Sequence, residues 1–222
     1  MPVSLLYQIA VLIGPLVVAI VFHEVAHGWV ARWRGDPTAA EQRRLSLNPL
    51  RHVDPVGTIL LPLGLALAHA PVFGWAKPVP VDASRLRHPR TDMMLVALAG
   101  PATNLLLALL AALALGGTGV PAGDAGRLVG AMLVQFIGVN VFLALFNLLP
   151  IPPFDGGHIV AGLLPRPLAA RWAALGRYGF LLLFGLLVLL PMLLPNANLV
   201  ARLVGPPARW LAGRFFALAG LS

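Results

Sequence analysis

Four stretches of this 222-residue chain are apolar over roughly the length that crosses a lipid bilayer, and they restrict its fold more than any other feature. They lie near 3–30, 91–115, 128–150 and 178–195. About 20 consecutive apolar residues span the hydrocarbon core as an α-helix, whereas irregular backbone facing lipid would leave its polar groups unpaired. The sequence therefore predicts an all-α polytopic membrane protein, a helix bundle of about 4–6 transmembrane segments. The weaker candidate segments are 56–72 and the region 198–220.

The charged residues follow a membrane pattern and give it an orientation. Only 11% of the chain is charged, with a net charge of +8, and the basic residues sit in the connections between apolar stretches. Nine of them lie between residues 31 and 90, whereas Arg127 is the only one in 116–127. Because basic connections stay on the cytoplasmic side, we expect 31–90 and 151–177 in the cytoplasm and 116–127 outside. The positive charge is thus a topological signal, and no nucleic-acid partner is expected.

Residues 56–81 have to agree with this topology, because both flanks of the apolar stretch 56–72 are basic. Prolines and glycines interrupt that stretch, and PVFGWAKPVPV (71–81) is typical of an extended hairpin with a Gly-Trp turn. We therefore expect a re-entrant or interfacial β-hairpin loop after the first helix, which returns to the cytoplasmic side. A true fifth span is the alternative.

The most informative motif lies inside the first apolar stretch, at VFHEVAHGWV (21–30). His23, Glu24 and His27 form the pattern H-E-x-x-H. Residues four apart on a helix share one face about 6 Å apart, so both imidazoles can reach one ion. Zinc accepts imidazole nitrogens, and the adjacent glutamate can take a proton from zinc-bound water.

A pair of core histidines with a capping glutamate is the alternative interpretation of this motif. Each ionisable group inside a membrane costs about 3 kcal/mol or more, so three together favour a functional site. Glu24 precedes Arg32 by eight residues, which places it about 12 Å below the charged end of its helix at 1.5 Å per residue. The site is therefore expected inside the membrane but nearer its cytoplasmic face.

A catalytic zinc site usually has three protein ligands, and the sequence offers few candidates for the third. Asp155 lies in NLLPIPPFDGGHI (147–159), directly after the stretch 128–150 and on the expected cytoplasmic side. The prolines there end a helix, and Gly156-Gly157 permits a sharp turn. From spacing alone, an ordinary loop aspartate is an equal interpretation, and His158 is an alternative ligand.

Taken in order, these motifs resemble the site-2 protease family of intramembrane zinc metalloproteases. H-E-x-x-H is followed by AGPATNLLLAL (99–109), which resembles the family's G-P-x-x-N segment, and by N-x-x-P-x-P-x-x-D-G at 147–156. The connecting sequences GDPTA, LSLNPLRHVDPVGTILLP and FGWAKPVPV resemble its compact members. The resemblance covers about residues 14–165 and includes neither a PDZ insert after 91–115 nor a CBS domain after the core.

The resemblance implies a role for each motif residue. Asp155 would be the third ligand of one zinc ion, with His23 and His27, and Glu24 the general base that activates water on the zinc. Asn104 and Asn147 would line the cleft and contact the substrate backbone. The substrates would be transmembrane segments of other proteins, cut within the bilayer in regulated intramembrane proteolysis. An edge strand at 71–81 could hold an unwound substrate, and a polar channel lined by Asn104, Asn147 and the motif residues would admit water.

The chain is expected to form a single membrane-embedded domain over 1–222, with a catalytic core at about 3–165 and C-terminal helices at about 177–220. Its location would be a prokaryotic cell membrane, as a multi-pass protein that could form a homo-oligomer. Two other functions stay open, namely an inactive membrane binding protein of the same fold and a metal transporter. A transporter predicts further ionisable groups along the other spans, and these spans lack them. Asn140 has no motif match and is interpreted as a link between helices.

Overall fold

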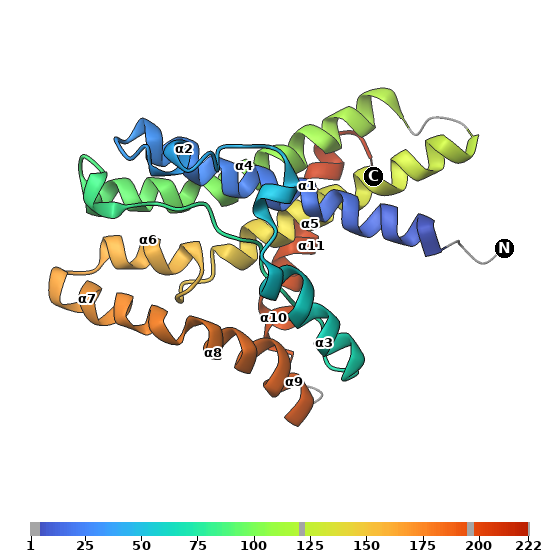
Figure 1. Cartoon of the computed structure of the whole chain (residues 1–222). Coiled ribbons are helices and arrows are strands. Elements are labelled where there is room, and N and C mark those ends of the chain that lie inside the picture. The colour runs from blue at the N-terminus through green and yellow to red at the C-terminus, as the bar shows by residue number, and fades with distance from the viewer. Residues whose placement is uncertain (1–4, 120–122, 195–197, 222) are drawn as a thin grey trace.

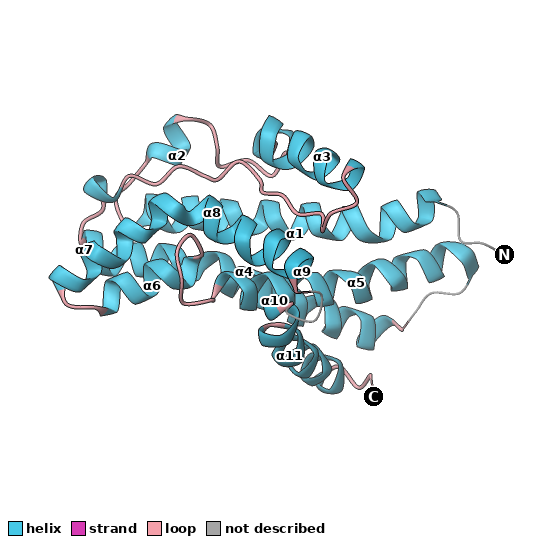
Figure 2. Cartoon of the chain, turned by 90° about the horizontal axis from the view of Figure 1, so that it is seen from below, coloured by secondary structure: helices cyan, strands magenta, loops and turns pink. Residues whose placement is uncertain are grey.

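The computed structural model describes residues 5–119, 123–194 and 198–221. Its long helices are α1 (Leu5–Trp33), α4 (Pro89–Thr118) and α5 (Gly123–Asn147). Its shorter helices are α2 (Thr38–Glu41), α3 (Leu61–Leu67), α6 (Asp155–Leu163), α7 (Arg166–Ala174), α8 (Gly179–Phe184), α9 (Leu190–Leu193), α10 (Leu199–Leu203) and α11 (Gly205–Leu218). Short 3-10 or π-helical turns lie at Pro49–His52, Pro55–Leu60, Ala83–Arg85, Leu175–Tyr178 and Gly185–Leu189. Figure 2 shows helices joined by loops and no strand in the described residues.

Four helical stretches are long and apolar enough to cross a membrane, as the sequence predicted. Three are α1, α4 and α5, which pack against one another, and the fourth is the nearly continuous helical stretch Arg166–Leu193 that contains α7, α8 and α9. Figure 1 shows this fourth stretch as a separate limb beside the bundle of the other three. The protein is therefore an all-helical membrane protein with four candidate spans. Parts of three predicted segments, at residues 3–4, 120–122 and 195, lie outside the described residues.

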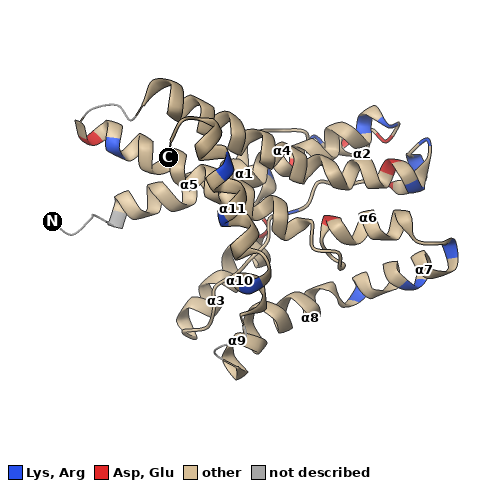
Figure 3. Ribbon diagram, turned by 180° about the vertical axis from the view of Figure 1, so that it is seen from behind, with Lys and Arg blue, Asp and Glu red and all other residues tan. Residues whose placement is uncertain are grey.

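The charges divide the bundle into two unlike ends. Figure 3 shows most of the lysine and arginine residues around α2, α7 and the beginning of α4. At the opposite end, Arg127 forms an ion pair with Asp124 on an exposed surface. This distribution agrees with the predicted cytoplasmic side, because the connections 31–90 and 148–165 meet at the basic end.

The prediction of a β-hairpin at 56–81 is wrong, although the segment does turn back on itself. Residues 55–67 are helical, because the Asp54 carboxylate accepts hydrogen bonds from the N–H groups of Val56 and Gly57 and so caps the helix. At 13 residues this helix is too short to be a candidate span. Residues 70–82, called the strap below, are extended, and the described part of the chain contains no strand with which they could pair. Pro71, Pro78 and Pro80 also lack the N–H that a ladder needs.

In the middle of the strap, one edge is bonded to the preceding segment of the chain. Trp75 and Lys77 donate their N–H groups to carbonyls of the 52–58 segment, at 3.1 and 2.8 Å. Their carbonyls accept from the side chains of Thr58 and Arg44, at 2.9 and 2.8 Å. These bonds hold the strap beside residues 52–58, so the chain returns to the end of the bundle from which the segment began.

The C-terminal region ends in a helix that packs across the bundle. Helix α11 has 14 residues, too few for a sixth span, for which the region 198–220 was a weaker candidate. Its Ala208 belongs to a buried apolar cluster with Ala112 of α4 and Ile137 of α5. Gly116 of α4 permits this approach, since a Cβ there would lie 2.0 Å from the carbonyl oxygen of Ala219.

Candidate metal centre

Helix α1 presents both histidines of the motif to α4. His23 and His27 lie one turn apart and are 7% and 9% exposed, and their rings meet edge to face with centroids 4.6 Å apart. Gly100 of α4 makes room for them, because a Cβ at that position would lie 2.5 Å from atoms of both rings. The glycine of the A-G-P-x-x-N segment is therefore needed for the close approach of α4 to the two imidazoles.

The third predicted ligand is positioned by the first turn of α6. Helix α5 ends at Asn147, and α6 begins at Asp155 after a proline-containing turn. A Cβ at Gly156 would lie 2.4 Å from the carbonyl oxygens of Leu148 and Leu149, so this glycine lets the turn pack directly onto the helix. At the other end of α6, Arg90 donates to the carbonyls of Gly162 and Leu164. Helix α6 is thus held at both ends, and the carboxylate at its start is fixed.

Three ligand atoms converge between these helices. The Nε2 atoms of His23 and His27 are 3.0 Å apart, and Asp155 Oδ2 lies 3.2 and 3.4 Å from them. Zinc bonds of about 2.0–2.1 Å in a tetrahedron give ligand–ligand distances of roughly 3.3–3.4 Å. The triangle formed by the three atoms therefore has the size that a zinc ion requires. Within the described residues, this is the only group of three or more such side chains that could hold a metal.

The hydrogen bonds on the far sides of the rings indicate where the protons lie. His27 Nδ1 faces the carbonyl oxygen of Val96 at 2.7 Å, which can only accept. His23 Nδ1 faces Asn104 Oδ1 at 2.6 Å. With Nδ1 protonated in each neutral imidazole, both Nε2 atoms carry lone pairs. Asp155 Oδ2 is buried and has no hydrogen-bond donor among the described residues. Three buried lone pairs facing one point repel one another unless a cation lies between them.

A buried amide network sets the orientation of the Asn104 side chain. Its Nδ2 donates to Asn140 Oδ1 at 2.7 Å and to the carbonyl of Ala19 at 3.1 Å, which leaves Oδ1 to accept from His23. Asn140 is itself oriented by donating to the carbonyl of Phe136. Both asparagines are fully buried. Asn140 links α5 to α4, as predicted, but the sequence did not connect it with the histidines. Its signal was a polar side chain in a membrane stretch, which is rare without a function.

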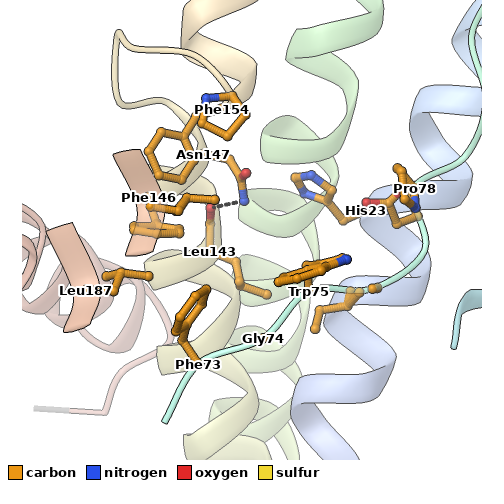
Figure 4. A pocket seen from close by; sticks show the side chains of 15 residues that line it. His23, Phe73, Gly74, Trp75, Pro78, Leu143, Phe146, Asn147, Phe154 and Leu187 are labelled. Atoms are coloured by element: carbon orange, nitrogen blue, oxygen red, sulfur yellow. Dashed lines mark hydrogen bonds between the residues drawn. The ribbon is translucent and has the colours of Figure 1, made fainter. Parts of the chain in front are cut away.

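Two cavities meet at His23 and Glu24. One, of about 380 Å³, is lined mainly by apolar and aromatic side chains of the strap, α5 and the fourth candidate span, including Phe73, Trp75 and Phe146. Figure 4 shows these rings around a space that His23 and Asn147 enter from opposite sides. The other, of about 370 Å³, is more polar and is lined by the three ligand residues, Glu24, Asn147 and His158, together with apolar side chains.

The remaining predicted site residues occupy distinct places. Glu24 and Asn147 line both cavities, and Glu24 Oε2 accepts the N–H of Val79 from the strap at 2.8 Å. His158 is exposed at the polar cavity and lies outside the cluster of three ligands. Asn104 lines neither cavity. The structure therefore brings His23, His27 and Asp155 together, with Glu24 beside them.

A membrane-embedded helix bundle with a His-His-Asp cluster and an adjacent glutamate defines a candidate metallohydrolase. The model of Peptidase family M50 matches residues 122–187. "Putative zinc metalloprotease YwhC" of Bacillus subtilis is 37% identical over 213 residues, which are 91% of this chain and 93% of the relative. "Putative zinc metalloprotease Rip2" of Mycolicibacterium smegmatis is 32% identical over 191 residues, 84% of this chain and 70% of the relative. No solved structure matches the chain. The chain belongs to peptidase family M50, the site-2 protease family.

Proposed function

We propose that the chain hydrolyses peptide bonds in transmembrane segments of other proteins, with one zinc ion held by His23, His27 and Asp155. The observation that carries this proposal is the triangle formed by the two Nε2 atoms and Asp155 Oδ2, 3.0–3.4 Å on a side, which has the size of a zinc ligand set. An inactive binding protein would need no such arrangement. A transporter would need a path of further polar sites across the membrane. Among the described residues, no second cluster of possible metal ligands is found.

Zinc in this position would lower the pKa of a water molecule to about 7 and polarise a carbonyl group. Glu24 is the base that we assign to the reaction, because it reaches both cavities and lies next to a ligand in the helix. Its carboxylate would accept a proton from water and then deliver it to the departing amine. Water would arrive through the cavity that opens at His158, which is expected to lie on the cytoplasmic side.

The apolar cavity and the strap support the proposed substrate class. A peptide bond in a helix is shielded by its own hydrogen bonds, so a transmembrane substrate has to unwind before it is cut. Since Trp75 and Lys77 use their backbone groups on one edge, alternation along an extended strand turns those of Gly74 and Ala76 to the other edge. Both line the apolar cavity and have no backbone hydrogen bond among the described residues. An unwound segment could pair with this free edge.

The two asparagines would have different roles. Asn147 lines both cavities, and its Nδ2 donates to the carbonyl of Leu143 at 3.0 Å, so its Oδ1 remains for a substrate N–H. Asn104 is fully buried, and for this residue we propose that it orients His23 instead of contacting substrate.

The test combines zinc content with cleavage, on wild-type protein in detergent or lipid and on Glu24→Gln and Asp155→Ala. A panel of single-span membrane proteins serves as substrate, and β-casein serves as an unfolded chain that needs no unwinding. We expect one zinc per wild-type chain and cleavage within a span. Glu24→Gln should keep the metal and stop cutting, and Asp155→Ala should lose the metal. Full zinc and activity in Asp155→Ala would move the third ligand to His158, and a wild type that binds no metal would support the binding protein.

A further inference from the structure

The strap touches the proposed base directly, through a single backbone group. Within Pro78-Val79-Pro80, Val79 has the only N–H, because proline has none. This N–H donates to Glu24 Oε2 at 2.8 Å. The other carboxylate oxygen, Oε1, has no hydrogen-bond partner among the described residues.

Val79 is also fixed against α1 by its side chain. It is only 7% exposed, and it packs on Gly28, where a Cβ would lie 2.8 Å from its Cγ1 atom. Gly28 lies one turn after Glu24 on the same face of α1. The backbone bond and the side-chain contact therefore meet the same surface of the helix and fix the position of this N–H relative to the carboxylate.

The bond to Glu24 continues the anchored edge of the strap. Trp75, Lys77 and Val79 are alternate residues, and each donates its N–H to the protein on that edge. The edge that faces the apolar cavity belongs to Gly74 and Ala76. One extended segment thus has a side bonded to the base and a side open to a ligand.

We infer that the Val79 N–H is a positioning group for Glu24, which holds one carboxylate oxygen so that the other is directed at the reacting water. The inference rests on the proposed function of the site. It also couples the two edges of the strap, because a substrate strand paired with Gly74 and Ala76 would fix the segment that orients the base. Substrate pairing would then tighten the alignment of Glu24 as well as place the scissile bond.

The test removes the N–H of residue 79 and leaves the rest of the full-length protein unchanged. Val79→Pro lacks the donor, whereas Val79→Ala keeps the donor and loses most of the packing. A misplacement of about 1 Å in a catalytic group can cost about 100-fold in rate, so kcat for β-casein should fall 10- to 100-fold in Val79→Pro with KM and zinc content retained. Val79→Ala should lower the unfolding temperature and reduce kcat far less.

A second measurement does not depend on cleavage. Glu24 and Glu41 are the only glutamates, so a chain labelled with ¹³C at the glutamate carboxyl gives two signals, and Glu41→Gln identifies the one from Glu24. We expect Val79→Pro to shift the Glu24 signal and Val79→Ala to leave it near its wild-type position.

If the signal stays in place in Val79→Pro, or moves equally in both variants, the inference is wrong. Loss of zinc from Val79→Pro would also overturn it, because Val79 would then support the whole metal site. A wild type without proteolytic activity would refute the proposed function. The carboxyl signal of Glu24 would still show whether the Val79 N–H holds this carboxylate.

Discussion

Replacing Asn104 with leucine removes the acceptor that holds His23 and keeps the branched shape of the side chain. The asparagine is fully buried, and its Oδ1 lies 2.6 Å from His23 Nδ1. Leucine can neither accept from the imidazole nor donate to Asn140 and Ala19. The Nδ1–H of His23 would then have no partner, and the tautomer that turns the Nε2 lone pair toward Asp155 would lose its support.

The expected size of the effect follows from two independent estimates. Removing a hydrogen-bond partner behind a metal-binding histidine costs about 10- to 100-fold in metal affinity, which is about 1.4–2.8 kcal/mol at 1.4 kcal/mol per tenfold. Leaving a buried donor unpaired costs about 1–3 kcal/mol, the same range. Asn140→Leu should cost less, under about tenfold, because Asn104 keeps its bond to Ala19 in that variant.

The assay is competition for zinc between the purified protein and a chelating dye, with the visible spectrum of the cobalt-substituted protein as a check on ligand geometry. Gln135→Leu is the matched control, since it also removes a polar side chain from the apolar stretch of α5 but lies outside the amide network. Zinc affinity in Asn104→Leu equal to that of wild type would refute the role of this bond. An equal loss in Gln135→Leu would attribute the effect to helix packing.

Two further predictions concern the scaffold of the site, and a third concerns an exposed ion pair. Gly100→Ala should expel zinc, because its Cβ would lie 2.5 Å from both imidazole rings. The control Gly138→Ala has nothing within 4 Å of its Cβ, so it should keep zinc and stabilise α5 by up to about 1 kcal/mol. Equal zinc affinity in the two variants would contradict the geometry. Arg90→Met should weaken zinc binding without removing it, since the C-terminal carbonyls of α6 lose their donor; metal titration would measure this, and an unchanged affinity would show that α6 is held without the arginine. Bonding to Arg85 lowers the pKa of the Glu41 carboxyl, so wild type should be slightly more stable than Glu41→Gln near neutral pH. This difference should disappear as the pH falls through the lowered pKa; thermal unfolding between pH 3 and about 7 would test the sign.

The parts of the fold that could be predicted depend on local patterns. Hydropathy located the four candidate spans, because a membrane helix needs about 20 apolar residues in sequence. The spacing of His23 and His27 predicted a shared metal face, because four residues make about one helical turn. The position of Asp155 was not decided by spacing, and it depended on the resemblance to a family. The sequence identified Gly156 as part of a sharp turn, but it could not show that this glycine contacts the carbonyl oxygens of Leu148 and Leu149 and so positions the carboxylate.

The parts that could not be predicted depend on contacts distant in sequence. Residues 71–81 have the composition of a hairpin. The preceding segment, however, becomes a helix that Asp54 caps, so the extended strap has no neighbouring strand with which to form a ladder among the described residues. The link from Asn140 to Asn104 joins residues 36 apart, on different helices. No periodic pattern contains such a pair, although the cost of a buried amide in a membrane marked each residue as unusual.

The arrangement of the two cavities reconciles two opposed needs of a reaction within a membrane. Under the proposed function, an unwound substrate segment would be stabilised by apolar walls and by the free backbone edge of the strap, while hydrolysis would consume water that such walls exclude. Here His23, Glu24 and Asn147 line both spaces, so water can reach the base from the polar side without crossing the apolar one. Because Val79 ties the base to the strap, the group that receives the proton belongs to the same wall that would hold the substrate. A change in how the strap is occupied would therefore reach Glu24 before it reached the three proposed metal ligands, which are held in place by α4 and α6.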